Sequence, residues 1–383
     1  MSMTSADLRV HNQVRLLRAV HDAEAPLTRA GAARLLGIGR NTAAALVGEL
    51  ERAHLVHEVP AETAGRGRPT TLLLPHPSGP LVFALDVRED SWTLARAELG
   101  GAREVLESGG HDRTPGVFAE IGAAVERHRT GRLAAVGMAI AGPIRDGRLL
   151  HIAHLGWDEV DLDDHLGRDW PRTVVDNDAR LAGLAEARRG VLHGAGCALH
   201  FHIDFDIGGT LLLDGDAQRG AHRIAGEFGH MPLTGSGLEC MCGARGCWSL
   251  DVGSNALVRH LGGKPGYGTG RELAQQILRR AEDGDAEAGA AIDANAAALG
   301  RGLGALANAL DPEAISLSGL GIDLLRLRRD AIEAACAEGL MAFRRNTPPQ
   351  IIAGTVGEQA PLTGAAEAGW DTILTETWLR ERL

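Results

Sequence analysis

The chain has 383 residues, of which 44% are hydrophobic and 23% charged, and its formal net charge is −11. This length exceeds that of one ordinary compact domain, so we expect two or three domains. The composition is that of a globular protein, and no apolar stretch is long enough to span a bilayer. The first residues lack the charged start and apolar run of a signal peptide. We therefore expect a cytoplasmic protein without membrane contact, in which thiols stay reduced.

The N-terminal segment predicts three helices. Residues 8–22 form an amphipathic pattern with one face spaced at three and four residues: Val10, Val14, Leu17 and His21. Two more helices surround the turn "GIG" at residues 37–39. Thr28 can cap the first of these, Gly37 suits its end, and Gly39 can precede the second. The first 80 residues also hold nine arginines against seven acids, whereas the remainder is strongly acidic. This contrast is a weak indication of nucleic acid at the N-terminal end.

The last of these helices has the character of a recognition helix. Its inner face is apolar and consists of Ala43, Leu46, Val47 and Leu50. The residues outside that face, which could meet base edges in a major groove, are Arg40, Asn41, Thr42 and Ala44. A three-helix bundle with a solvated face is the alternative interpretation.

A basic hairpin follows directly. Residues 55–59 and 70–74 predict two strands, and the loop between them contains "GRGRP". Gly67 lets the backbone approach a surface, and Arg66 and Arg68 suit phosphates or a narrow minor groove. A flexible, solvated loop is the alternative. We predict a winged helix-turn-helix domain that binds double-stranded DNA over residues 1–75, with residues 76–80 as a linker.

The remainder, residues 81–383, alternates strand and helix patterns. Paired strands are predicted at 81–87 and 92–99 and again at 197–204 and 208–215. Each pair is followed by further helices and buried strands, including a strand at 350–356. This repeated order predicts an α/β fold with two similar lobes and a cleft between them.

Three of the five cysteines of the chain are clustered in one short segment. Cys240, Cys242 and Cys247 fall within eight residues, and His230 precedes the first by ten. One imidazole and three thiolates suit tetrahedral zinc in a closed, structural site. A disulfide or a chance cluster is the alternative, and an odd number of cysteines in a reducing compartment speaks against the disulfide.

Six motifs in order resemble the ROK family of repressors, open reading frames and sugar kinases, and specifically its repressor branch. They are "GRGRP", "AGPI", "VVDNDA", "AGEFGHMPL", "ECMCGARGCW" and "APLTGAAEAG". The resemblance implies an actin/hexokinase-like pair of lobes behind a winged head, and a homodimer or homotetramer. It also implies a sugar or sugar-phosphate effector between the lobes that changes DNA affinity. The family's zinc spacing, H-x9-C-x-C-x4-C, matches His230, Cys240, Cys242 and Cys247.

The resemblance further implies an effector site. Its matching positions are Gly142, Asn177, Asp178, Glu227 and His230, and Ser249 stands where glutamate is usual. His230 would serve zinc through one ring nitrogen and the effector through the other. Asn177 and Asp178 could equally cap a helix.

The resemblance separates repressor from kinase at two turns. Asp178 occupies the family's catalytic-base position, and Asp86 also persists. Arg88, Glu89 and Asp90, however, replace the small residues of the first phosphate-binding turn, and Asp204 and Asp206 alter the second. Bulk and negative charge oppose a triphosphate there. We therefore expect that the protein is not an enzyme. We expect it to be a DNA-binding regulator of carbohydrate metabolism that represses transcription. A sugar kinase, or a regulator whose cleft no longer binds sugar, remains the alternative.

Overall fold

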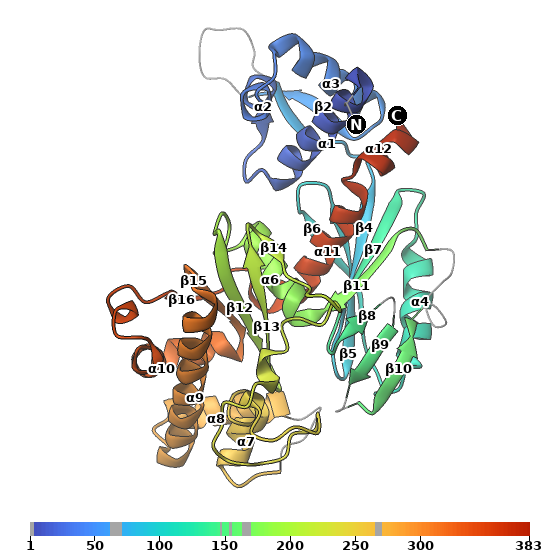
Figure 1. The fold of residues 1–383 in the computed structure, drawn as a ribbon. Helices are drawn as coiled ribbons and strands as arrows, with labels where there is room; N and C mark the ends of the chain where they lie inside the picture. Colours follow the sequence, from blue (N-terminus) through green and yellow to red (C-terminus); the bar gives the residue numbers. More distant parts are fainter. Residues whose placement is uncertain (1–3, 62–70, 146–147, 153–154, 163–169, 265–269) are drawn as a thin grey trace.

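A small N-terminal head stands on two larger lobes, and the C-terminal helix lies beside the head (Figure 1). The computed structural model describes residues 4–61, 71–145, 148–152, 155–162, 170–264 and 270–383. Among these residues, no helix is both long and apolar enough to cross a membrane.

The head has the predicted helices and a three-stranded sheet in the order β1-β3-β2. Its elements are α1 (Ser5–Asp22), β1 (Leu27–Thr28), α2 (Arg29–Leu36), α3 (Arg40–Arg52), β2 (Val56–Pro60) and β3 (Thr71–Pro75). The predicted caps are confirmed. The Thr28 side chain accepts a hydrogen bond from the amide of Gly31, Gly37 ends α2 with a φ of 67°, and Gly39 is the N-cap of α3. The very short strand β1 was not expected from the sequence.

The first lobe is built on a five-stranded sheet in the order β11-β7-β4-β5-β6. Its strands are β4 (Leu81–Val87), β5 (Ser91–Glu98), β6 (Arg103–Gly110), β7 (Leu133–Ile140) and β11 (Thr173–Asn177), and its helix is α4 (Val117–His128). A small sheet beside it contains β8 (Ile144–Arg145), β9 (Arg148–Ile152) and β10 (Trp157–Asp161). Strands β4, β7 and β11 run parallel, whereas β5 and β6 extend the sheet antiparallel.

The second lobe repeats this plan with the sheet order β14-β13-β12-β15-β16. Its strands are β12 (Cys197–Ile203), β13 (Ile207–Leu213), β14 (Asp216–Ala217), β15 (Ala314–Gly319) and β16 (Gln350–Ala353). Its helices are α7 (Ser254–His260), α8 (Gly270–Glu282), α9 (Ala286–Leu310) and α10 (Leu320–Gly339), with short turns η1 (Phe228–His230), η2 (Trp248–Leu250), η3 (Arg344–Asn346) and η4 (Gly357–Gln359). The predicted α/β fold of two similar lobes is confirmed. Strand β16 ends three residues earlier than expected.

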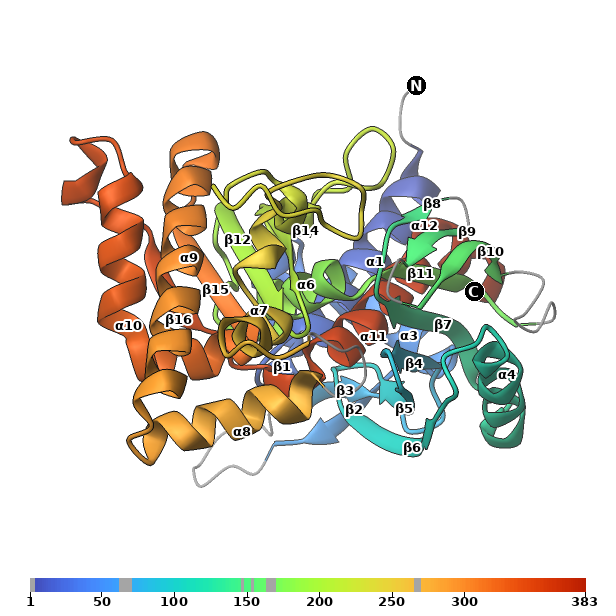
Figure 2. The ribbon, with the colours of Figure 1, turned by 90° about the horizontal axis from the view of Figure 1, so that it is seen from below.

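Two helices, α6 (Asp178–Arg189) and α11 (Ala360–Ile373), pack against each other between the lobes (Figure 2). Helix α11 lies on strands β4 and β7 of the first lobe, while α6 lies on β12 and β13 of the second. Their backbones approach closely, since a Cβ on Gly364 would lie 1.8 Å from the carbonyl oxygen of Leu181. Only glycine permits this contact.

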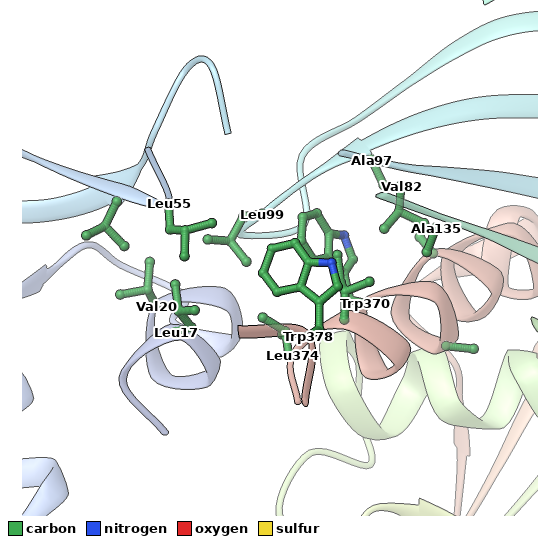
Figure 3. Close-up of a cluster of buried hydrophobic side chains, with 14 of the residues drawn as sticks. Leu17, Val20, Leu55, Val82, Ala97, Leu99, Ala135, Trp370, Leu374 and Trp378 are labelled. Carbon is green, nitrogen blue, oxygen red and sulfur yellow. The ribbon is translucent and has the colours of Figure 1, made fainter. Parts of the chain in front are cut away.

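One hydrophobic core joins the head to the first lobe. Head residues such as Leu17 and Leu55 share it with body residues such as Leu99, Trp370 and Trp378 (Figure 3). The last helix, α12 (Glu376–Arg382), packs on α1. A division at residue 75 assigns α12 to the body, but in space it lies with the head.

Candidate effector cleft and zinc cluster

A cavity of about 610 Å³ lies between the two lobes. Elements of both lobes line it, among them the ends of β4 and β11, the start of α6 and the turn between β12 and β13. It is lined by all six residues predicted to bind the effector: Gly142, Asn177, Asp178, Glu227, His230 and Ser249. The structure thus brings together residues that are up to 107 positions apart in the sequence, 142 to 249.

Gly142 forms the turn that follows β7. Its φ is 94°, a conformation that favours glycine, and an added Cβ would lie 2.9 Å from Ile152 and 3.0 Å from the carbonyl oxygen of His151. The Asn177 side chain donates to the Gly142 carbonyl over 3.3 Å. The glycine therefore lets the turn lie close against β9, while the Asn177 side chain holds its carbonyl.

Asn177 and Asp178 start α6. The Asn177 side chain accepts from the amide of Arg180 over 3.1 Å, and the Asp178 side chain accepts from the amide of Ala179 over 2.7 Å. Asn177 is the N-cap of α6, and Asp178 is the first residue of that helix. These bonds use the only side-chain oxygen of Asn177 and one of the two carboxylate oxygens of Asp178, and both residues line the cavity.

A buried arginine holds the loop that brings Glu227 to the cleft. Arg180 forms an ion pair with Asp176 and donates to the carbonyl of Ala225 over 2.7 Å. Both members of the ion pair are almost fully buried. Arg180 thus connects the start of α6 to the segment that precedes Glu227.

The carboxylates of the cleft are electrostatically crowded. Burial raises the pKa of Asp178, and the nearby Asp86 and Asp204 raise it further, while His202 opposes them. Burial also raises the pKa of Asp206 and of Glu227. Burial, and for Asp178 the neighbouring carboxylates, thus disfavour the charged form of these carboxyl groups.

The geometry of His230, Cys240, Cys242 and Cys247 fits tetrahedral zinc. Their four ligand atoms lie within 4.8 Å of one another. The sulfurs of Cys242 and Cys247 are 3.7 Å apart, and His230 Nδ1 lies 3.8 Å from the sulfur of Cys240. Zinc–sulfur bonds of about 2.3 Å place tetrahedral sulfurs about 3.8 Å apart. All five cysteines are free, so the disulfide alternative is not realised.

The two ring nitrogens of His230 point in different directions. Nδ1 faces the sulfurs, whereas Nε2 lies 3.8 Å from Glu227. Burial, together with contacts from Cys242 and Cys240, raises the pKa of the Cys247 thiol to about 12. A divalent cation would offset the cost of holding these thiolates together.

Several residues at the cleft were not singled out from the sequence. Arg271 of α8 forms an ion pair with Asp204 and lies 5.4 Å above the ring of Phe205. His202 bonds Ser318 over 2.8 Å and also lines the cavity. These residues belong to ordinary helix and strand patterns, so no motif marks them.

The predicted DNA-contacting residues lie on the first turns of α3. Arg40, Asn41 and Thr42 are exposed, and Ala44 is half-buried. The inner face that was expected from the sequence is buried, with Ala43, Leu46, Val47 and Leu50 in the core. Arg66, Gly67 and Arg68 of the wing lie outside the described residues.

These features define a class: a two-lobed α/β protein of hexokinase-like architecture with a winged head and a cleft between its lobes. The model of the ROK family matches residues 104–369, and the chain belongs to that family.

Individual relatives resemble either the whole chain or its body. The xylose repressor of Bacillus subtilis (strain 168) is 23% identical over 376 residues, 95% of this chain and 96% of that protein. The crystal structure of a ROK family transcriptional regulator, a homologue of the E. coli MLC protein, matches 98% of both chains with a TM-score of 0.75 and 23% identity. A ROK family glucokinase from Streptomyces griseus, solved with glucose and AMPPNP, matches 76% of this chain and 99% of its own with a TM-score of 0.65 and 27% identity.

Proposed function

We propose that this protein is a DNA-binding transcription regulator of carbohydrate metabolism, a repressor whose affinity for its operator responds to a sugar in the cleft. The single observation that carries the proposal is the combination, on one chain, of an exposed recognition-helix face with a cleft lined by the residues that match the family's sugar site, Ser249 standing in place of the usual glutamate. The likeness to the xylose repressor extends over head and body, whereas the glucokinase structure matches 76% of the chain.

The protein would act as a cytoplasmic homodimer or homotetramer. A dimer presents two copies of α3 to successive major grooves, about one helical turn apart. Arg40 and Asn41 would contact bases, with Thr42 and Ala44 beside them, and Arg66, Gly67 and Arg68 would contact the backbone or the minor groove. Selection of bound sequences from random DNA tests this. We expect a roughly palindromic site for the wild type and loss of its sequence preference in Arg40→Ala and Asn41→Ala.

Zinc would be a structural component of the cleft wall. His230, Cys240, Cys242 and Cys247 would hold it, and it would stabilise the segment that presents Glu227 and Ser249. Bound zinc supplies charge neutralisation and rigidity at this place. The chain's own residues make the contacts with the sugar hydroxyls.

Kinase activity is the second candidate, because Asp178 retains a carboxylate at the family's catalytic-base position. Ion pairs between the protein's own side chains form at the two turns that would receive ATP phosphates. Arg88 pairs with Asp86 over 2.8 Å and donates to the carbonyl of Glu358, and Arg271 pairs with Asp204 across the second turn. We expect no sugar-dependent ADP formation from ATP. Turnover comparable to that of a glucokinase assayed in parallel would establish the kinase instead.

The charge of the cleft favours a sugar without a phosphate. Among the described residues that line it, seven are carboxylates: Asp86, Glu89, Asp178, Asp204, Asp206, Glu227 and Glu239. The three arginines that line it are already engaged: Arg88 with Asp86, Arg271 with Asp204, and Arg259 with the carbonyl of Leu250. A phosphate adds a charge of about −2 near this excess of negative charge.

Calorimetric titration compares D-glucose, D-xylose and D-glucosamine with D-glucose 6-phosphate. We expect at least one unphosphorylated sugar to bind about tenfold or more tightly than the phosphate, which corresponds to a difference of about 1.4 kcal/mol. Tighter binding of the phosphate would contradict the charge argument alone. If none of the sugars bound, the cleft would have no effector role of this kind, and the alternative of a regulator whose cleft no longer binds sugar would hold.

A further inference from the structure

The two helices between the lobes each connect the cleft to the head. Helix α6 begins with Asp178 in the cavity wall and ends at Arg189. Helix α11 has Pro361 in the cavity wall and carries Glu367 and Trp370 toward the head. Since α6 lies on the sheet of the second lobe and α11 on that of the first, a change in the angle between the lobes changes the arrangement of these helices.

One head residue, His21, meets both helices. It lies in the last turn of α1 and is 0% exposed. Its Nε2 lies 2.9 Å from the Glu367 carboxylate of α11, and its carbonyl accepts from the Arg189 guanidinium of α6 over 2.8 Å. Arg189 and Glu367 also pair with each other over 2.7 Å. His21, Arg189 and Glu367 therefore form one polar triad, in which His21 and Glu367 are buried and Arg189 is partly exposed. The triad joins the head to a helix of the second lobe and a helix of the first.

Both ring nitrogens of His21 have partners. The amide of Gly100 donates to Nδ1 over 3.1 Å, and Nε2 contacts the Glu367 carboxylate over 2.9 Å and the Arg189 guanidinium over 2.8 Å. Gly100 lies in the turn between β5 and β6 of the first lobe. The ring also packs against Trp370, with centroids 5.3 Å apart. These contacts fix both the position and the orientation of the end of α1.

We propose that His21 is the positioning residue through which the arrangement of the two lobes sets the orientation of the DNA-binding head. When the lobes move, Arg189 and Glu367 move with different sheets, and the backbone and ring of His21 follow them because both are buried and hydrogen-bonded. This inference rests on the proposed DNA-binding function and adds the residues that couple it to the cleft.

A second histidine of α1 provides a matched control for a contact that only attaches the head to the body. His11 on the same helix also pairs with a glutamate of the C-terminal region, Glu376 of α12, over 3.1 Å. That pair is exposed. A contact that only attaches the head would behave alike at His11 and His21, whereas a coupling contact requires the triad with α6 and α11.

The experiment measures the reciprocal effect, since coupling acts equally in both directions. DNA selected by the wild-type protein from random sequences is bound to the full chain, and hydrogen exchange is followed at residues 177–186 and 360–366 near the cleft. We expect bound DNA to change exchange there by about fivefold or more in the wild type and in His11→Gln. No such change is expected in His21→Gln, or in Arg189→Gln, which is the second variant in case the buried histidine is needed for folding. Both variants are measured at DNA concentrations that saturate the head.

The outcomes separate the inference from the function on which it rests. An equal exchange change in all four proteins, or no change at the cleft when the wild type is saturated with DNA, would overturn the role of His21 and leave DNA binding intact. Failure to select any DNA would overturn the proposed function, and the inference with it.

Discussion

The carboxylate of Glu186 provides a quantitative test of how the two inter-lobe helices are held. Glu186 is 0% exposed and accepts three backbone hydrogen bonds. One oxygen accepts from Val191 and Thr355 over 3.1 and 3.3 Å, and the other accepts from Val356 over 2.9 Å. It thereby ties the end of α6 to the segment that leads into α11.

In Glu186→Gln one oxygen becomes an NH2 group, which turns a donor toward at least one of these amides. A hydrogen bond to a charged acceptor contributes about 1.5–3 kcal/mol, and a buried unsatisfied donor costs about 1–3 kcal/mol. We expect the free energy of unfolding to fall by about 2–4 kcal/mol. The assay is urea unfolding at pH 7, with the midpoint and slope compared between variant and wild type.

Glu126→Gln is the matched control, because the Glu126 side chain on α4 is 52% exposed. We expect it to change the free energy of unfolding by less than about 0.5 kcal/mol. A change as small as this in Glu186→Gln would refute the argument that Glu186 connects the two helices.

Three further predictions concern zinc, pH and the cleft turn. Elemental analysis should find one zinc ion per chain in the wild type and none in Cys242→Ser, and Cys242→Ser should unfold at a lower temperature than the wild type. A wild-type protein that contains no zinc and is no more stable than Cys242→Ser would refute the site. Although burial opposes it, the hydrogen bond from His21 and the charge of Arg189 lower the pKa of Glu367 from 4.5 to about 2. Because this pKa is lowered in the folded state, the ionised carboxylate stabilises the fold above pH 4.5, and this stabilisation is lost as the pH falls toward 2. In urea unfolding, wild type and Glu367→Gln should differ in stability by about 3 kcal/mol at pH 6, and the difference should shrink between pH 4.5 and pH 2. A difference independent of pH would contradict the assignment. Gly142→Ala, at a φ of 94°, should lose about 1–3 kcal/mol of stability and its sugar binding by calorimetry, whereas Gly131→Ala, which has open space around it, should keep both.

Much of the cleft and head could be predicted because local residues specify them. Thr28 and Gly37 act on their own helix ends, and the spacing of the zinc ligands is local to one loop. The strand expected over residues 350–356 was too long, and β16 ends at Ala353. The amides of Thr355 and Val356 donate to the Glu186 carboxylate and therefore do not pair with a neighbouring strand.

The remaining features depend on contacts between distant segments. His21 fits the apolar face of an amphipathic helix, and its partner Glu367 is 346 residues away. The placement of α12 on α1 and the pairing of Arg271 with Asp204 likewise join segments whose sequences show only ordinary helix patterns. Periodicity indicates that such residues are buried or exposed, but the partner is decided by the tertiary fold.

The most direct test of the account is fluorescence anisotropy of the selected operator DNA with the full-length protein, with and without saturating D-glucose, D-xylose or D-glucosamine. The account predicts tight, salt-dependent binding whose Kd changes by about fivefold or more with at least one of these sugars, and no such response in Asp178→Asn. Tight binding that is indifferent to every sugar that occupies the cleft would contradict it.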